Sequence, residues 1–270
     1  MSVDLPLIDA ELLSRLQAGH AAYLRAGWEA VAAEPGNPHG LEVRSFGSTL
    51  ACRAPGLADV APYNRALLLG DGERLDDLLA WFGEADLGLT IELGPAEIHE
   101  PLARRLAAAG LFQTGFLSVV YGRPQTDLEV SRRIRTVELG PERLDLFVDL
   151  WSQGLSRGAE WRVELVGLWR RWFTMPGFRL YLASYDEIPA AIAGLWCADG
   201  LAQLHGATTM LEYRGLGCQA ALLCHRLADA TAAGCDLVTA ETSHGSAGHR
   251  NLQRAGLELA TIKALWRRDR

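Results

Sequence analysis

Apolar positions along the chain follow two different spacings. Segments with an apolar residue every three or four positions are typical of helices packed on a core, and short apolar runs bounded by Gly, Pro, Asn or Asp are typical of strands. In the first half, the pattern predicts helices at 6–25, 73–82 and 98–109 and strands at 41–46, 49–53, 64–69, 89–93 and 116–121. In the second half, it predicts helices at 143–155, 160–173, 218–233 and 247–255 and strands at 178–185, 190–197, 201–208, 236–240 and 260–266, the last completing that half. Helices and strands mix in both halves, which indicates an α/β class, or α+β with a mixed sheet.

Two segments of the chain end alike. Residues 104–111 read RRLAAAGL and residues 250–257 read RNLQRAGL, so five of the eight positions are identical. In each, an amphipathic helix stops at a glycine suited to left-handed backbone, and a strand-like run follows. Internal duplication explains the match, and convergence on a common helix stop is the alternative. A polar Pro/Gly stretch at 122–127 follows the first copy, so we expect two domains, residues 1–126 and 127–270.

Composition and charge narrow the class of protein. A net charge of −7 argues against nucleic-acid binding and favours a cationic or amine substrate. The sequence shows neither a run of about 18 apolar residues nor a signal-peptide pattern, so we expect no membrane partner and a cytoplasmic protein. The five cysteines are odd in number and form no C-x-x-C pair, which predicts neither disulfides nor a metal site.

Lysine is nearly absent from the chain. Lys263 is the only lysine among 26 Lys and Arg residues, a bias that we associate with GC-rich bacterial genomes. It lies in the predicted closing strand, with no glycine loop before it. The sequence therefore excludes P-loop chemistry and a pyridoxal Schiff base, which each need a suitably placed lysine.

A glycine-containing loop, LEYRGLG at 211–217, lies between the strand ending at 208 and the helix starting at 218. Glycines let backbone approach a phosphate closely, and a helix start offers unpaired N–H groups to an anion. Arg214 adds a planar charged donor at the rim. An ordinary strand–turn–helix junction is the alternative. A Rossmann fingerprint fits less well, because its third glycine would fall at Ala220.

The stretch 208–222, TTMLEYRGLGCQAAL, resembles the strand–loop–helix signature [QR]-x-x-G-x-[GA] of the GCN5-related N-acetyltransferases, the GNAT family. Gln219 departs from it by standing where Gly or Ala is usual, and a subset of bacterial relatives looks similar there. Residues 234–238 and 250–257 also resemble that family's next strand and helix, so the resemblance covers about 131–270.

The resemblance implies a tandem GNAT-like fold with two similar halves, in which the second half binds acetyl-CoA in a cleft between strands ending near Thr208 and Ala240. Three groups of cofactor-binding residues follow from it. They are Thr208, Thr209 and Met210 for the pantetheine arm, Arg214, Gly215, Leu216, Gly217, Cys218 and Gln219 for the pyrophosphate, and Asn251 for a further hydrogen bond.

The first half resembles a degenerate copy of the same fold. Where a phosphate loop should precede its helix, it reads LGDGE at 69–73. Asp71 and Glu73 would repel a pyrophosphate, so we expect this half to be structural or to shape the substrate pocket.

Acetyl transfer needs a neutral amine, and an alkyl amine has a pKa near 10, so a base must take its proton. Glu241, just past the predicted strand at 236–240, is the first candidate, with a turn-capping role as the alternative. His205 is second, because a histidine pKa is naturally close to neutrality, although a buried structural histidine is also typical of mid-strand positions.

The leaving thiolate poses a separate question. The tyrosine that often protonates it in the family aligns with Leu252, so Ser243, Ser246 or water could replace that acid, or the thiolate could leave unassisted. Cys218 at a helix start could be nucleophilic, but a packing role fits better, because the same N–H groups should hold pyrophosphate.

Tryptophans crowd the second half and could form an aromatic wall beside the acceptor or simply fill the core. They are Trp151, Trp161, Trp169, Trp172 and Trp196.

The sequence therefore predicts an N-acetyltransferase that transfers the acetyl group from acetyl-CoA to an amine, with a small-molecule amine as the first candidate acceptor. Two alternatives remain: a protein N-acetyltransferase, and a non-catalytic CoA-binding sensor or scaffold. A homodimer is compatible with each of these functions.

Overall fold

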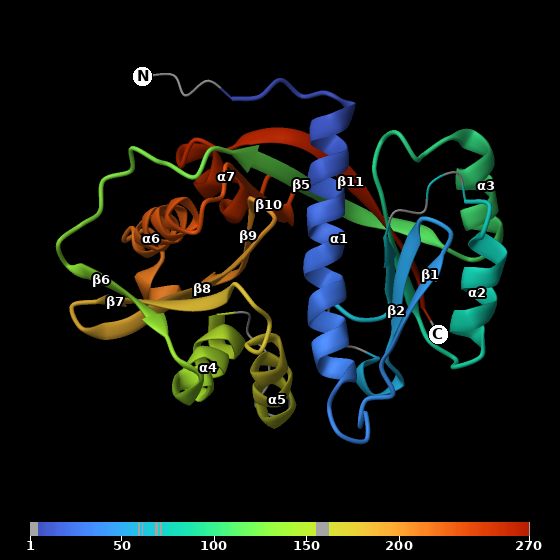
Figure 1. Cartoon of the computed structure of the whole chain (residues 1–270), viewed down its shortest axis with the longest axis horizontal. Helices are drawn as coiled ribbons and strands as arrows, with labels where there is room; N and C mark the ends of the chain where they lie inside the picture. The colour runs from blue at the N-terminus through green and yellow to red at the C-terminus, as the bar shows by residue number, and fades with distance from the viewer. Residues whose placement is uncertain are drawn as a thin grey trace. The chain divides into compact units, whose positions relative to one another are not determined.

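The computed structural model describes residues 5–58, 60, 62–67, 70, 72–154 and 162–269. The chain forms two compact units, coloured by position along the chain in Figure 1. The C-terminal unit comprises Met1–Ile8 and Val120–Leu259, and the N-terminal unit comprises Asp9–Val119 and Ala260–Arg270. No described helix is both long enough and apolar enough to cross a bilayer.

The C-terminal unit is a mixed sheet with helices on both faces. Its strand order is β5-β10-β9-β8-β7-β6, in which β9 and β10 are parallel and β6 to β9 are antiparallel neighbours. Its strands are β5 (Phe112–Gly122, shared with the other unit), β6 (Ile134–Leu139), β7 (Phe178–Tyr185), β8 (Ile188–Ala198), β9 (Leu201–Thr209) and β10 (Leu237–Ser243). Its helices are α4 (Leu144–Gly154), α5 (Arg162–Trp172), α6 (Cys218–Ala232) and α7 (Ala247–Arg254). In Figure 1, α6 lies on one face of this sheet and α4 and α5 on the other.

Side-chain alternation in β7 agrees with this layering. Phe178 contacts the rings of Trp169 and Trp172 in α5, whereas Tyr181 donates a hydrogen bond to Asp229 in α6. Residues 178 and 181 must point to opposite faces of a strand. Each face of the sheet is therefore covered by its own helical layer.

The N-terminal unit repeats the same arrangement in shorter form. Its strand order is β1-β2-β3-β4-β11, with β3 and β4 parallel and the other neighbours antiparallel. Its strands are β1 (Glu42–Phe46), β2 (Thr49–Arg53), β3 (Arg65–Leu67), β4 (Leu89–Leu93) and β11 (Glu258–Arg268, shared with the other unit). Its helices are α1 (Ala10–Ala32), α2 (Leu75–Gly83) and α3 (Glu100–Ala108). Each unit thus holds one parallel pair joined by a helix, β3-α2-β4 and β9-α6-β10, as the mixed-sheet prediction requires.

The closing strands are exchanged between the halves. The strand expected to complete the second half is β11, but its residues Ala264–Arg268 pair with Leu89–Leu93 of β4 in the N-terminal unit. In the C-terminal unit the corresponding place beside β10 belongs to β5, and the Thr239 hydroxyl donates to the Val120 carbonyl across that pair at 2.9 Å. An apolar run predicts a strand but not its partner. The domain boundary at residue 126, and the assignment of cofactor binding to the second half, remain predictions.

Most predicted elements form where the pattern places them. The clearest differences are in the first helix, which ends at Ala32 rather than at 25, in β5, which begins at Phe112 rather than at 116, and in β6. The first helix starts at Ala10 rather than Pro6, because the Asp9 side chain caps it by accepting from the Leu12 N–H at 2.8 Å. Strand β6 (Ile134–Leu139) was not predicted, because this short edge strand carries exposed Arg135 and Glu138 and lacks a regular apolar alternation.

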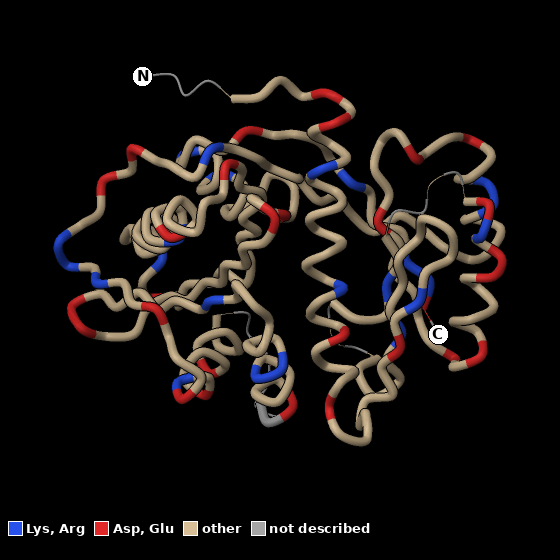
Figure 2. Tube along the Cα trace, viewed as in Figure 1, with Lys and Arg blue, Asp and Glu red and all other residues tan. Residues whose placement is uncertain are grey.

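Each unit has its own hydrophobic core. In the N-terminal unit, leucines of α2 and α3 pack with Trp81 and Phe82 against β4. In the C-terminal unit, Leu222, Leu223 and Leu227 of α6 pack against β8, β9 and β10. Basic and acidic residues are interspersed over both units, as the blue and red segments of Figure 2 show.

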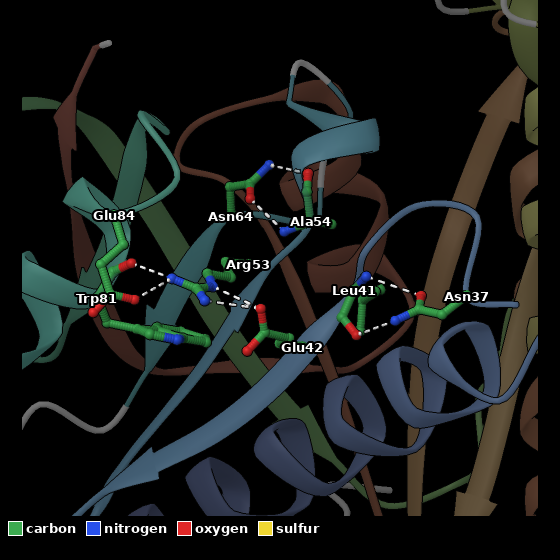
Figure 3. Close-up of polar contacts among 8 residues, drawn as sticks. All are labelled: Asn37, Leu41, Glu42, Arg53, Ala54, Asn64, Trp81 and Glu84. Atoms are coloured by element: carbon green, nitrogen blue, oxygen red, sulfur yellow. Dashed lines mark hydrogen bonds and ion pairs between the residues drawn. The ribbon is translucent and has the colours of Figure 1, made fainter.

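Polar contacts fix the loops of the N-terminal unit (Figure 3). The Asn64 amide donates to the Ala54 carbonyl and accepts from its N–H, which holds the connection between β2 and β3. Arg53 lies over the Trp81 ring at 4.6 Å and bonds the carboxylates of Glu42 and Glu84. These contacts are internal to the unit.

A buried group of charges joins β11 to the same unit. Glu92 on β4 is 2% exposed, and its carboxylate bonds Lys263 at 3.2 Å and Arg65, with His20 at 3.8 Å. Burial alone would raise the pKa of Glu92, but Lys263, Arg65 and His20 outweigh it and lower that pKa to about 2. The only lysine of the chain is therefore used to hold the exchanged strand.

This group should make stability depend on acid. Because the folded pKa of Glu92 lies below the unfolded value near 4.5, its contribution is present above about pH 4.5 and lost as pH falls toward 2. The free energy of unfolding, measured by urea denaturation against pH, should lose this acid dependence in Glu92→Gln. The matched variant Glu100→Gln, which breaks only an exposed pair with Arg104, should keep the wild-type profile. If Glu92→Gln kept the same acid dependence as wild type, the low pKa of Glu92 would not be its cause.

Candidate functional site

The two parallel strands of the C-terminal unit separate part of the way along their length. Pairing of β9 with β10 runs from Leu201 opposite Leu237 to Leu204 opposite Ala240. Strand β9 then continues to Thr209 and β10 to Ser243. Backbone groups beyond Leu204 and Ala240 are thus released from this ladder, and buried peptide groups need other partners.

A bulge in β9 starts this separation. Gly194 of β8 lies opposite His205 and Ile192 lies opposite Thr208, so two residues of β9 face one residue of β8. Gly206, in the bulge, has φ +59°, a left-handed conformation that glycine adopts without steric cost. Bulges bend strands and increase their twist, and they are enriched beside functional sites.

The loop after β9 opens directly into α6. Gly217 is the N-cap of the helix with φ +90°, and no side chain caps this end, whereas Ser246 caps α7. The first N–H groups of a helix, here those of Cys218, Gln219 and Ala220, have no acceptor within the helix. This end therefore presents donors and a positive dipole suited to an anion.

The polar side chains of the loop turn back toward the end of β9. Gln219 Nε2 donates to the Thr208 carbonyl at 3.0 Å and to the Thr209 hydroxyl at 2.9 Å. Arg214 donates to the Thr209 carbonyl and to the Gly154 carbonyl, both at 3.2 Å. The Arg214 fork is thus held beside the loop by backbone oxygens, a contact that the sequence did not suggest.

Other predicted loop residues differ in exposure. Leu211 and Leu216 are 71% and 40% exposed, so apolar side chains border the loop in solvent. Cys218 is buried in the core below α6, and burial raises the pKa of its thiol. A packing role for Cys218 is the interpretation that this geometry favours. Met210 directs its N–H to the Ala190 carbonyl at 2.9 Å, and Gly215 has φ +79°.

His205 does not have the near-neutral pKa expected from its sequence. Its ring lies 5.0 Å from Phe178 and 6.3 Å from Trp169 in stacked orientations, and both ring nitrogens are inaccessible to solvent. Burial, and then the charge of Arg226, lower the pKa of His205 to about 3, against a weaker effect of a backbone hydrogen bond with Leu195. The imidazole is therefore neutral and a poor base at physiological pH.

Glu241 follows the last paired residue of β10. Ala240 and Leu204 form the last pair of the β9–β10 ladder, so Glu241 and His205 are the first residues beyond the paired segment. Alternation directs both side chains away from the α6 core that takes up Leu204 and Ala240. Glu241 is half-buried, so it remains partly open to solvent where the strands separate.

Helix α7 places the remaining candidates near the end of β10. Leu252 is 8% exposed and belongs to the core, in keeping with the absence of an acid at that position. Ser246 accepts from the His249 N–H and contacts the Thr242 hydroxyl, both at 3.1 Å, while Ser243 is exposed. Asn251 is half-buried and accepts from Arg254 at 3.2 Å.

Aromatic side chains gather on the α4 and α5 face. Trp169 is the centre of this cluster, with Phe147 at 4.9 Å and Trp151 at 6.2 Å between ring centroids. Trp151 and Trp169 are half-buried, whereas Trp172 is buried. Trp196 is buried, and its indole N–H donates a hydrogen bond to the Pro176 carbonyl. Trp161 lies outside the described residues.

In the N-terminal unit, a carboxylate of the chain occupies the loop that corresponds to the phosphate loop. Glu97 accepts from the Gly70 N–H at 3.2 Å and from the Gly94 N–H at 2.6 Å. Arg105 bonds the neighbouring Gly72 carbonyl at 2.8 Å. Asp71, which was expected to repel a pyrophosphate, lies outside the described residues. An internal carboxylate thus takes the Gly70 N–H, one of the donors of this loop.

Solved structures share this fold over nearly the whole chain. A GCN5-related N-acetyltransferase from Kribbella flavida matches with a TM-score of 0.62 and 18% identity, over 89% of this chain and 94% of that chain. One from Sphaerobacter thermophilus gives 0.61 and 15%, over 98% and 94%. A tandem GNAT protein from the clavulanic acid biosynthesis pathway gives 0.60 and 16%, over 98% and 97%. Scans against protein-family models and against curated proteins found no match. At these identities the likeness shows the fold.

The low pKa of His205 should affect both the stability of the protein and its NMR spectrum. Because its folded pKa lies below the unfolded value of 6.5, the folded state binds fewer protons, and stability is lost as pH falls from about 6.5 toward 3. The imidazole resonances of His205 should show no titration between pH 5 and 8 in NMR spectra, with His205→Gln used to assign them. Titration with a midpoint near 6.5 would contradict the burial described above.

Proposed function

Starting from the tandem GNAT fold of this chain, we propose that its C-terminal unit binds acetyl-CoA and transfers the acetyl group to an amine. The observation that carries this proposal is the separation of β9 from β10 next to an uncapped, glycine-opened helix. The two features place released backbone groups and an anion-binding helix end at the same edge of one sheet. The structural neighbours named as N-acetyltransferases support the reaction class.

The loop from Arg214 to Gln219 would hold the diphosphate of the cofactor. N–H groups of the first turn of α6 would donate to phosphate oxygens, and Gly217 would allow the backbone to approach them. The Arg214 guanidinium supplies positive charge at the rim, while exposed Leu211 and Leu216 offer apolar contacts. Asn251 on α7 would add a hydrogen bond.

The pantetheine arm would run along the free edge of β9. Thr208, Thr209 and Met210 follow the bulge, where the edge facing β10 is no longer paired. The Gln219 bonds to Thr208 and Thr209 keep this segment extended. An amide-containing arm could then pair with it as a short added strand.

In the chemical step, the amine nitrogen attacks the thioester carbon, a C–N bond forms, and the C–S bond breaks. Glu241 would take the amine proton, directly or through a water. His205 is the weaker candidate, because its ring nitrogens are buried and its pKa is about 3. The departing thiolate would receive a proton from water, Ser243 or Ser246, since Leu252 cannot supply one.

The acceptor would lie on the α4 and α5 face, where the half-buried Trp151 and Trp169 pack together. The net charge of −7 favours an amine that arrives as a cation. A small-molecule amine is the first candidate acceptor, and a protein amine is the second. We further propose that the protein acts in the cytoplasm.

A non-catalytic CoA sensor is a second candidate function, because the buried Leu252 replaces the acid that the family often uses. Binding of CoA without turnover of any amine in a broad panel would favour the sensor. Release of free thiol with one amine class would favour the enzyme.

The phosphate loop is tested by Gly217→Val. A side chain at φ +90° is strained and would stand where backbone meets phosphate, so CoA binding should be abolished in calorimetry. Gly234→Val is the matched control, because Gly234 has φ +77° at the other end of α6 with open space around it. It should lose similar stability, about 1–2 kcal/mol, but keep CoA affinity. Unchanged affinity in Gly217→Val would mean that the loop has another purpose.

The base is tested by Glu241→Gln. Removing the proton acceptor should lower kcat by roughly 10²–10⁴ and leave CoA affinity nearly intact. The loss should shrink as pH approaches the pKa of the amine, where the substrate arrives neutral. A loss of kcat/KM that stays constant with pH, accompanied by about 1 kcal/mol lower stability, would instead identify Glu241 as a turn residue.

A further inference from the structure

The end of β9 is held by side chains from the loop that follows it. Gln219 uses both hydrogens of its amide, on the Thr208 carbonyl at 3.0 Å and on the Thr209 hydroxyl at 2.9 Å. It is half-buried, so these bonds are shielded from competing water. Where the similar family signature has Gly or Ala, this chain therefore has a side chain with two specific partners.

Arg214 extends the same set of contacts to the opposite helical layer. Its Nε donates to the Thr209 carbonyl and its Nη2 to the Gly154 carbonyl, each at 3.2 Å. Gly154 is the last residue of α4, which packs on β8 and β9, on the face opposite to α6. One guanidinium thus joins the loop, the end of β9 and the end of α4.

The end of α4 fits closely against β9 at this point. A Cβ added to Gly154 would lie 2.3 Å from the Thr208 hydroxyl oxygen, closer than real Cβ contacts come. The helix end and the strand end therefore cannot move independently without losing contact. A shift in the loop that draws Arg214 away from Gly154 would free this helix end.

We propose that Arg214 and Gln219 are positioning residues that form a brace between the diphosphate loop, β9 and α4. The brace keeps the loop in its binding shape before the cofactor arrives, which lowers the ordering cost of binding. It also links occupancy of the loop to the position of α4 on the acceptor face. This inference rests on the proposed CoA site. It adds an order of binding, in which the cofactor binds first and thereby positions α4 for the acceptor.

The charge of Arg214 suits this double role. Both of its acceptors are neutral carbonyls, and among the described residues no carboxylate pairs with it. Its positive charge is therefore still available to a nearby diphosphate. Binding of an anion at the loop would hold Arg214, and by reciprocity the contact with Gly154 would favour the anion.

The brace is tested first without ligand, by hydrogen exchange of the full-length protein. In Arg214→Gln, the backbone amides of Trp151–Gly154 should exchange about tenfold faster than in wild type, because the last turn of α4 loses its tie. Arg135→Gln, which removes an exposed arginine on the distant edge strand β6, should leave them unchanged. Equal exchange in wild type and Arg214→Gln would overturn the brace.

The second measurement adds CoA. Gln219→Ala restores the small residue of the family signature, and it should raise the Kd for CoA about tenfold in calorimetry. In wild type, CoA should slow exchange in Trp151–Gly154, and this slowing should be lost in Arg214→Gln even where CoA still binds. A merely structural role for these side chains would not produce such a response.

The outcomes separate the two proposals. If wild type fails to bind CoA, the proposed function is wrong, and the ligand-free exchange still decides on the brace. If CoA binds wild type, but Gln219→Ala binds equally well and α4 does not respond, the inference is wrong and the CoA site remains.

Discussion

The early end of the parallel pairing between β9 and β10 is the feature on which the proposed cofactor site depends. Beyond Leu204 and Ala240 the two strands no longer satisfy each other, since the bulge at Gly206 turns β9 aside. Released backbone groups must find other partners. Gln219 and Arg214 supply part of them from the following loop, and an amide-bearing cofactor arm could supply the rest. The start of α6, which has no side-chain cap, lies at the same strand end, so one distortion of the sheet brings both features together.

The N-terminal unit has the same strand–helix–strand plan, but its glycine loop and its closing strand make different contacts. Glu97 accepts from the Gly70 N–H of its glycine loop, and the buried pair of Glu92 with Lys263 secures the exchanged strand β11. Such a buried pair is costly to break, because either partner alone would remain as an uncompensated charge. The N-terminal unit thus has a carboxylate of its own chain bonded to its glycine loop and a buried ion pair at its closing strand.

The sequence predicted the elements well because their apolar spacing is strong, as in β7 and α6, and because the loop at 214–219 carries glycines with a specific backbone role. It could not predict that β11 pairs with β4, since an apolar strand pattern does not name its partner. It left two interpretations of His205 open, a base and a buried structural histidine, because the burial of its ring against Phe178 and Trp169 and the charge of Arg226 come from residues distant in sequence. The contacts of Arg214 with Gly154 span 60 positions and leave no local signal.

The most direct test of this account is a crystal structure of the protein grown with CoA. The account predicts diphosphate oxygens within hydrogen-bonding distance of the N–H groups that open α6, the pantetheine arm beside Thr208–Met210, and the sulfur close to the point where β9 and β10 separate. A diphosphate bound at Gly70 in the N-terminal unit, or away from α6 altogether, would contradict it.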